Sequence, residues 1–349
     1  MTPISISTAY LGNSMLPVVA QADQQLTTLE TESTTGQYAN LGLQLGEQSG
    51  YEMSLRNADD VLESFSGANA VVNGQLSASA DALSSITTSA QSALSALTTW
   101  TPGGPADSEL ATTGDSSLQG LITAANSTYA GSYLFSGVNT SEAPMAAYSS
   151  TSSSYSSLVS AFQTQFGCSP TSAAAGSISA SDVTSFLSGA FDDQFVGGNW
   201  TSNWSSASST DTTAEISPGQ TVTTSTNTNT AGFQDLAQGY AMVSLLSDSS
   251  LSSSAKQAVV TAAMSSITAG SSAITATAAN LGQVQSTLKQ TDDDITTQMT
   301  LLKTQLGGLD NVSETQVATQ LNTLTTVIET AYQVTAQLQK LSLAQYLPA

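Results

Sequence analysis

Apolar residues recur alternately three and four positions apart along two long stretches of this chain. Such heptad spacing keeps one side of a helix facing a partner, so it restricts the fold to long paired helices. The first stretch extends from Leu62 to Leu97 and the second from Val260 to Leu306. Each predicts a helix of about 40 residues, roughly 60 Å long at a rise of about 1.5 Å per residue.

Polar residues interrupt these heptad series at Asn69, Ser271, Gln285 and Asp292. A polar residue at such a position lowers stability but fixes the register and the number of partner helices. The alternative is that these residues lie at the edge of the apolar seam and face solvent. The sequence alone leaves both interpretations open.

Shorter amphipathic helices are predicted near both ends of the chain. Apolar residues recur at helical spacing from Leu16 to Leu29 and again from Val317 to Leu338. Each helix has one apolar face, so the two suit each other or neighbouring subunits as partners. The chain then ends on "LSLAQYLPA", with no charge after Lys340. We expect this apolar tail to be buried, since an exposed one would be sticky.

The middle of the chain, residues 141–230, has a different character. Ser and Thr dominate it, and helical periodicity is weak. The stretch "TAEISPGQTVTTS" predicts a β-hairpin with Pro218–Gly219 as its turn. Large aromatic residues supply enough bulk for a small core: Phe162, Phe166, Phe186, Phe191, Phe195, Trp200 and Trp204.

These patterns together predict a mainly α fold, in which long antiparallel helices form a coiled-coil rod with an inserted β-containing domain. Pro102 and Pro105 end the first long helix, and a further helix is predicted from about Ser116 to Asn126. We expect three domains: a terminal coiled-coil assembly domain (1–45 with 305–349), a helical rod domain (46–140 with 231–304) and the inserted variable domain (141–230).

The charge balance argues against two classes of partner. The chain carries 26 acidic and 5 basic residues, a formal net charge of −21. A negative surface repels phosphate backbones and anionic lipids, so we expect neither nucleic acid nor membrane as a partner. No run of about 18 apolar residues predicts a membrane span, and the N-terminus lacks the basic and apolar regions of a secretory signal. Solubility alone also explains the acidity.

Common catalytic and metal-binding residue sets are missing. The chain has no histidine and one cysteine, Cys168, which excludes His-dependent nucleophiles, His/Cys zinc sites and an internal disulfide. No phosphate-binding Gly-Lys-Ser/Thr loop occurs. Asp192–Asp193 is the one tempting carboxylate pair, and a solvated loop is the favoured interpretation. Asp292–Asp294 lacks the alternating spacing of a calcium loop. We therefore predict no enzyme, no cofactor and no metal.

Three stretches, in this order, resemble the bacterial flagellin family. "LTTLETESTTGQYAN" is similar to the end of that family's first helix, which stops at a Thr-Gly pair, here Thr35–Gly36. "LITAANSTYAGSYLFSGVNTSEAPM" is similar to the segment that leaves the helical domain. "TLTTVIETAYQVTAQLQKLSLAQYL" resembles the C-terminal helix, with its Ser342–Leu343 and Tyr346–Leu347 pairs. The likeness covers about residues 1–140 and 231–349.

The resemblance implies an extracellular structural protein of the flagellum, exported by the flagellar type III apparatus without a cleaved signal. It implies self-assembly into a ring or helical layer, and terminal segments that fold into a coiled coil on assembly. Flagellin, a second hook-associated protein on the hook side and an export chaperone are the implied partners. The "SLAQYLPA" ending favours the family's hook-associated members, which join hook to filament, over filament flagellin, which usually ends on Leu-Leu-Arg. A secreted coiled-coil adhesin or needle-tip protein stays a further alternative.

The same resemblance, with the apolar spacing, points to the residues that meet on assembly. The predicted inner assembly contacts are Leu321, Leu324, Ile328, Leu338, Leu341, Leu343 and Tyr346, with Leu26 and Leu29 opposite. The alternative is that these residues form an ordinary core within one chain.

Overall fold

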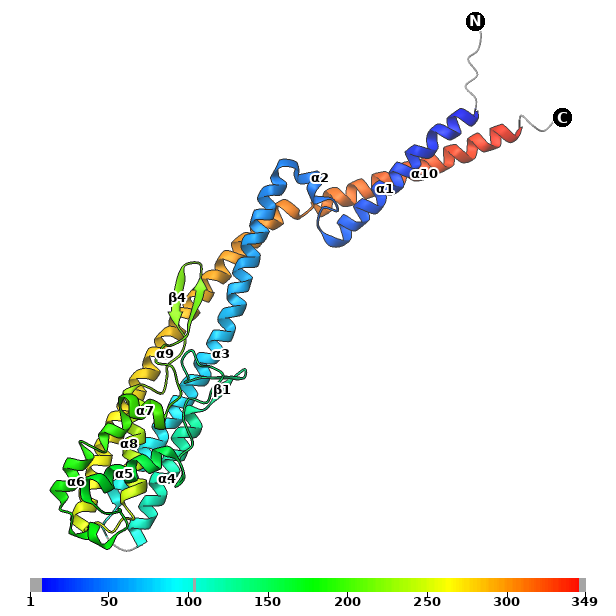
Figure 1. Ribbon diagram of the computed structural model, residues 1–349. Helices are drawn as coiled ribbons and strands as arrows, with labels where there is room; N and C mark the ends of the chain where they lie inside the picture. The colour runs from blue at the N-terminus through cyan, green and yellow to red at the C-terminus, as the bar shows by residue number, and fades with distance from the viewer. Residues whose placement is uncertain (1–7, 103–104, 345–349) are drawn as a thin grey trace. The chain divides into compact units, whose positions relative to one another are not determined.

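The computed structural model describes residues 8–102 and 105–344 and divides the chain into two compact units (Figure 1). Unit 1 comprises Met1–Glu63 and Thr296–Ala349, and unit 2 comprises Ser64–Ile295. Helices dominate both units. Two very long helices, α3 (Ser49–Thr99) and α9 (Ser253–Asp310), contribute to each.

The long helices confirm the heptad prediction and exceed its length, with 51 residues in α3 and 58 in α9. Within unit 2 the predicted seam positions of both helices are buried or half-buried. Leu76, Leu83 and Ile86 of α3 and Ile267 and Ile274 of α9 are almost completely buried. Burial at this spacing is the reason that both segments are helical over so many turns, because the packed apolar stripe supplies most of a helix's stability.

Three of the four polar seam residues link the long helices directly. Asn69 Nδ2 donates to Asp292 Oδ1 across the helix pair and to the carbonyl oxygen of Ile216, both at 2.9 Å. Gln285 Nε2 donates to Ser77 Oγ at 3.0 Å. These contacts favour the register-fixing interpretation over a solvent-facing edge, since Asn69 itself is fully buried.

Replacing Asn69 should therefore cost more than replacing another buried polar residue of the same seam. Asn69→Leu keeps the number and branching of the side-chain heavy atoms but removes both hydrogen bonds, and we expect it to lower the free energy of unfolding by about 2 kcal/mol. Ser79→Ala is the control, because Ser79 Oγ bonds only the carbonyl of Gln75 in its own helix; its loss should stay below about 0.5 kcal/mol. Urea unfolding measures both, and equal losses would contradict the linking role.

Two further helices complete the bundle of unit 2. Helix α4 (Pro105–Ala125) begins earlier than predicted, with Pro105 as its first residue, a position where the missing N–H has no intrahelical partner to lose. Helix α8 (Ala231–Leu246) packs against α4 and is buried on nearly all sides. Glycine permits its close contact with α9: a Cβ on Gly270 would lie 2.8 Å from the backbone nitrogen of Leu236.

The insert between α4 and α8 contains the predicted hairpin and more helix than its sequence indicated. Strands β3 (Thr213–Ser217) and β4 (Gln220–Thr223) are antiparallel, with Ala214 opposite Val222. A smaller pair precedes them, β1 (Thr128–Tyr129) and β2 (Ser132–Tyr133). The helical elements are α5 (Ser153–Phe166), η2 (Ala173–Ser177), α6 (Ala180–Leu187), η3 (Asp192–Phe195) and α7 (Gly197–Asn203). Ser152 and Ser179 cap α5 and α6, so the serine-rich sequence starts helices rather than forming only linkers.

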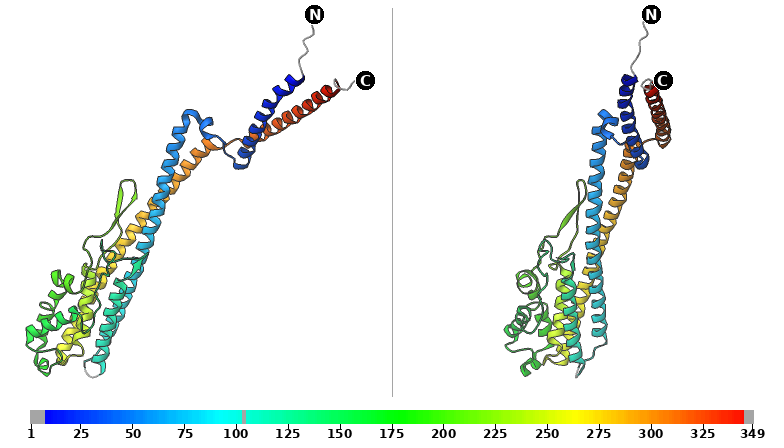
Figure 2. Two further views of the ribbon diagram at one scale, coloured as in Figure 1. Left: turned by 45° about the vertical axis from the view of Figure 1, so that its right-hand side comes forward. Right: turned by 90° about the vertical axis from the view of Figure 1, so that its right-hand side faces the viewer.

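An aromatic core holds the insert together, as the sequence predicted. The rings of Phe186, Phe191, Phe195 and Trp204 contact one another in succession, with centroids 4.9–5.6 Å apart. The insert lies on one side of the bundle formed by α3, α4, α8 and α9 (Figure 2). Its buried residues belong to the same apolar core as those helices. The three-domain division predicted from the sequence stays a prediction.

By length and composition alone, helix α9 is long and apolar enough to cross a membrane. One 18-residue window reaches a mean hydropathy of 1.3, with 33% of it buried. The sequence prediction found no such run because Ser, Thr and Gly interrupt the apolar residues. Val259, Ala263 and Ile267 of this helix are buried in the core of unit 2.

Candidate assembly surface

Unit 1 contains a pair of antiparallel helices formed by the two ends of the chain (Figure 1). Helix α1 (Thr8–Thr35) packs along α10 (Glu314–Ala344). Helix α1 ends as predicted at Thr35–Gly36, where Gly36 takes a φ of +71° and its N–H donates to the carbonyl of Glu32. Such a left-handed residue is a common helix stop. The short α2 (Leu41–Leu45) and η1 (Gly46–Gln48) then lead into α3.

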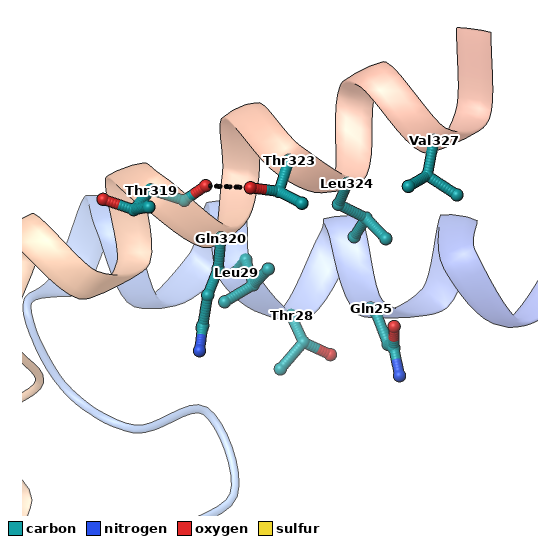
Figure 3. Close-up of a pocket in the computed structure, with 8 residues that line it drawn as sticks. All are labelled: Gln25, Thr28, Leu29, Thr319, Gln320, Thr323, Leu324 and Val327. Carbon is teal, nitrogen blue, oxygen red and sulfur yellow. Dashed lines mark hydrogen bonds between the residues drawn. The ribbon is translucent and has the colours of Figure 1, made fainter. Parts of the chain in front are cut away.

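Few side chains are fully buried in the apolar seam between α1 and α10. Ala22 of α1 and Val317 and Ile328 of α10 are buried, whereas the leucines between them are only half-buried. Leu29 and Leu324 line an open pocket of about 500 Å³ between the two helices (Figure 3). Gln25, Thr28, Thr319, Gln320, Thr323 and Val327 complete its lining. The pair therefore leaves part of its apolar seam uncovered.

Most of the exposed large apolar side chains described in the structure belong to unit 1. On the terminal helices they are Leu16, Val18, Val327, Tyr332 and Val334, between 39% and 66% exposed. Val327 and Val334 are seven residues apart and so lie on one face of α10, beside the seam that α1 covers. These two valines, which we call the exposed apolar strip, are available for contact with a partner and form a candidate interaction surface.

The threonine hydroxyl groups on these two helices already have hydrogen-bond partners within their own helices. Thr319, Thr323 and Thr326 on α10 each donate the hydroxyl to the carbonyl four residues earlier, at 2.7–2.9 Å. Thr27 and Thr31 on α1 do the same. A hydroxyl satisfied inside its own helix needs no partner elsewhere, so packing against a neighbour leaves no unpaired donor.

Among the residues whose burial the structure describes, unit 1 buries little apolar surface. The buried apolar residues described in this unit are few and scattered: Ala22, Leu55, Leu62, Leu306, Val317 and Ile328. The continuous apolar core instead belongs to unit 2, from Leu76 to Leu288. A two-helix pair with so small a core is marginal until further surfaces cover it.

The predicted contact residues fall into two groups. Leu26, Leu29, Leu321, Leu324 and Ile328 lie on the facing sides of α1 and α10, buried or half-buried. Leu338, Leu341 and Leu343 belong to α10, but their side chains lie outside the described part of the structure, as does the whole of Tyr346. Their role in assembly stays a prediction.

The sequence prediction missed Val18, Val327, Tyr332 and Val334. A usable pattern was present, since Val327, Val334 and Leu341 follow one another at intervals of seven.

The carboxylates considered for catalysis have structural surroundings. Asp192 Oδ1 accepts a hydrogen bond from Gln238 Nε2 of the buried helix α8, at 2.8 Å. Burial, with a smaller effect of the nearby Asp192, raises the pKa of Asp235. Within residues 8–102 and 105–344, no group of three or more His, Cys, Asp or Glu side chains could hold a metal ion. Asp192 thus serves to join the insert to α8.

Comparison with known proteins matches both ends of the chain to one family. Residues 6–140 match the model of the bacterial flagellin N-terminal helical region, and residues 264–347 match that of the C-terminal helical region. Among solved structures, a protein of Vibrio parahaemolyticus described as a flagellar hook-associated protein has a similar fold. It is 12% identical with a TM-score of 0.52, over 75% of this chain and 97% of that one. No curated protein sequence matches the chain.

The two family models together cover more than half of the sequence, so the chain belongs to the flagellin family. Members of this family are structural proteins that assemble into the extracellular flagellum. Family membership thus confirms the resemblance seen in the sequence.

Proposed function

We propose that this chain is the junction protein between hook and filament, the family member called hook-associated protein 3. The C-terminal stretch "SLAQYL" carries the choice, because it resembles the hook-associated members and not the Leu-Leu-Arg ending of filament flagellin. A protein described as hook-associated has a similar fold, as the proposal requires. Its neighbours in the flagellum would be flagellin on one side and a second hook-associated protein on the other.

The exposed apolar strip on α10 supports assembly in either role. A tube or ring repeats one contact between two different faces of each subunit, and a strip left uncovered within one chain is available as one of those faces. Before assembly, an export chaperone would cover the same helices during passage through the type III apparatus. A filament flagellin is the second candidate, because the matching family models are those of flagellin helical regions.

Loss of the gene separates these two functions. In a strain without it, negative-stain electron microscopy should show hooks that carry no filament, with monomeric flagellin in the culture medium. This outcome follows because flagellin without a junction layer has nothing on which to polymerise. Complementation with the intact gene is the control and should restore filaments. Normal filaments, or filaments changed only in length, would contradict the junction role and favour a flagellin variant.

A further inference from the structure

Arg56 is the single arginine of the chain, in a protein that has only five basic residues. It lies in the first turns of α3, within unit 1. Its Nε donates to Glu52 Oε1 one turn earlier, and its Nη2 donates to Asp310 Oδ2, the last residue of α9. One side chain thus joins the start of one long helix to the end of the other.

Asp310 lies where the two connections to the terminal helices meet. Its carbonyl oxygen accepts the N–H of Tyr38 at 3.0 Å, and the N–H of Val312 donates to the carbonyl of Gly36 at 2.9 Å. Gln37 and Asn311 form an antiparallel bridge between these two bonds. The chain leaving α1 and the chain entering α10 are therefore paired by a very short backbone ladder.

The Asp310 carboxylate depends on Arg56 for its charge balance. The residue is only 3% exposed, and its Oδ1 has no hydrogen-bond partner among the described residues. Among the described residues, Arg56 is the one basic residue within ion-pair distance of the Asp310 carboxylate. A buried carboxylate that loses its cation is strongly unfavourable, so removing Arg56 leaves the ladder built around an unpaired charge.

The position of the ladder matters for the helix pair that follows it. A seam with apolar residues at intervals of three, four and seven packs nearly as well when one helix slides by a heptad. The ladder lies directly at the C-terminal end of α1 and the N-terminal end of α10, so it determines which residues of the two helices face each other.

We propose that Arg56 is a latch that holds this ladder closed and so sets the register in which α1 pairs with α10. It is a positioning residue, since it acts through Asp310 on the two connections. The proposal concerns how the assembly surface is formed and applies equally to a junction protein and to a filament subunit.

Hydrogen exchange of the full-length protein, followed by mass spectrometry, tests the latch. In Arg56→Gln, peptides containing Tyr38 and Val312 should exchange about ten-fold faster or more, while peptides from α8 stay unchanged. Lys289→Gln is the matched control, because it removes one positive charge from the exposed Lys289–Asp293 pair of unit 2; its Tyr38 and Val312 peptides should exchange as in the native protein. Rapid exchange of these peptides in the native protein, or no change in Arg56→Gln, would overturn the proposal.

Two further variants separate charge from shape. Arg56→Gln combined with Asp310→Asn replaces the unpaired carboxylate by a neutral amide, so protection of the Tyr38 and Val312 peptides should return to within about three-fold of native. Arg56→Lys keeps the charge but loses the two-pronged geometry, and should be intermediate. Failure of the double variant to recover would overturn the electrostatic account. If the Arg56→Gln variant were incorporated into cell-attached flagella as fully as the native protein, the proposed role of Arg56 in positioning α1 and α10 for assembly would be overturned.

Discussion

Gly270→Ala should lower the free energy of unfolding of unit 2 by about 3 kcal/mol, because the new methyl group would clash with closely packed backbone atoms. A Cβ at this position would lie 2.8 Å from the backbone nitrogen of Leu236 and 3.0 Å from the carbonyl oxygen of Gly232. Both atoms belong to the backbone of α8, which is packed on nearly every side and cannot retreat. All three tryptophans belong to unit 2, so their fluorescence during urea unfolding reports on this unit.

Gly282→Ala in the same helix is the control and should act in the opposite direction. Apart from its chain neighbours and the backbone of its own helix, no atom of the described residues lies within 4 Å of a Cβ built at Gly282. Alanine is a better helix former than glycine, so this variant should gain up to about 1 kcal/mol. If both variants were stabilising, the close contact between α8 and α9 would be contradicted. If both were destabilising to the same degree, the effect would not come from the contact.

The long helices were predictable because their apolar spacing has a single physical purpose. Leu76, Leu83 and Ile86 recur at heptad intervals, and the structure buries all three. Helix α8 carried no comparable pattern. It is apolar on all sides, so it has no face to detect, and the contact through Gly270 involves a residue with no side chain to count. Only its approximate beginning could be located.

The insert was predictable in its hairpin and its aromatic core, but not in its short helices. The Pro218–Gly219 turn is a local property of the sequence, and the structure places it between β3 and β4. Helices α5 and α6 begin at serine caps, but contacts between distant residues, such as Phe162 with Phe186, hold them in the core of the insert. Such contacts leave no periodic trace in a segment rich in Ser and Thr.

The candidate assembly surface was predictable only on the side of α10 that faces α1. Apolar spacing, with the family resemblance, selected Leu321 and Leu324, which the structure places on the side of α10 that faces α1. Whether α10 can bind a second partner besides α1 depends on which of its apolar side chains α1 leaves exposed. That information comes from the packing of α1, which leaves Val327 and Val334 exposed.

Val327→Asp combined with Val334→Asp should abolish assembly without unfolding the chain. Both side chains are exposed, so unit 2 should keep its stability to within about 0.5 kcal/mol. In the assembled state each substitution would remove roughly 1.5 kcal/mol of stabilisation from the burial of a valine. Desolvation of each new carboxylate would cost several kcal/mol more. The loss recurs at every subunit contact. Cell-attached flagella should therefore lack the variant, which immunoblotting should find as monomer in the culture medium.

Thr326→Asp combined with Gln333→Asp is the control for this assembly test. It adds the same charge at the same seven-residue interval, one position earlier on α10, where both native side chains are polar and exposed. Because no apolar contact is lost, most of this variant should remain in the cell-attached fraction. Equal release of both variants would mean that added charge alone prevents assembly in a chain whose net charge is already −21. Retention of the valine variant would show that the exposed strip of α10 is not a subunit contact, and the contact would then have to be sought on another face of unit 1.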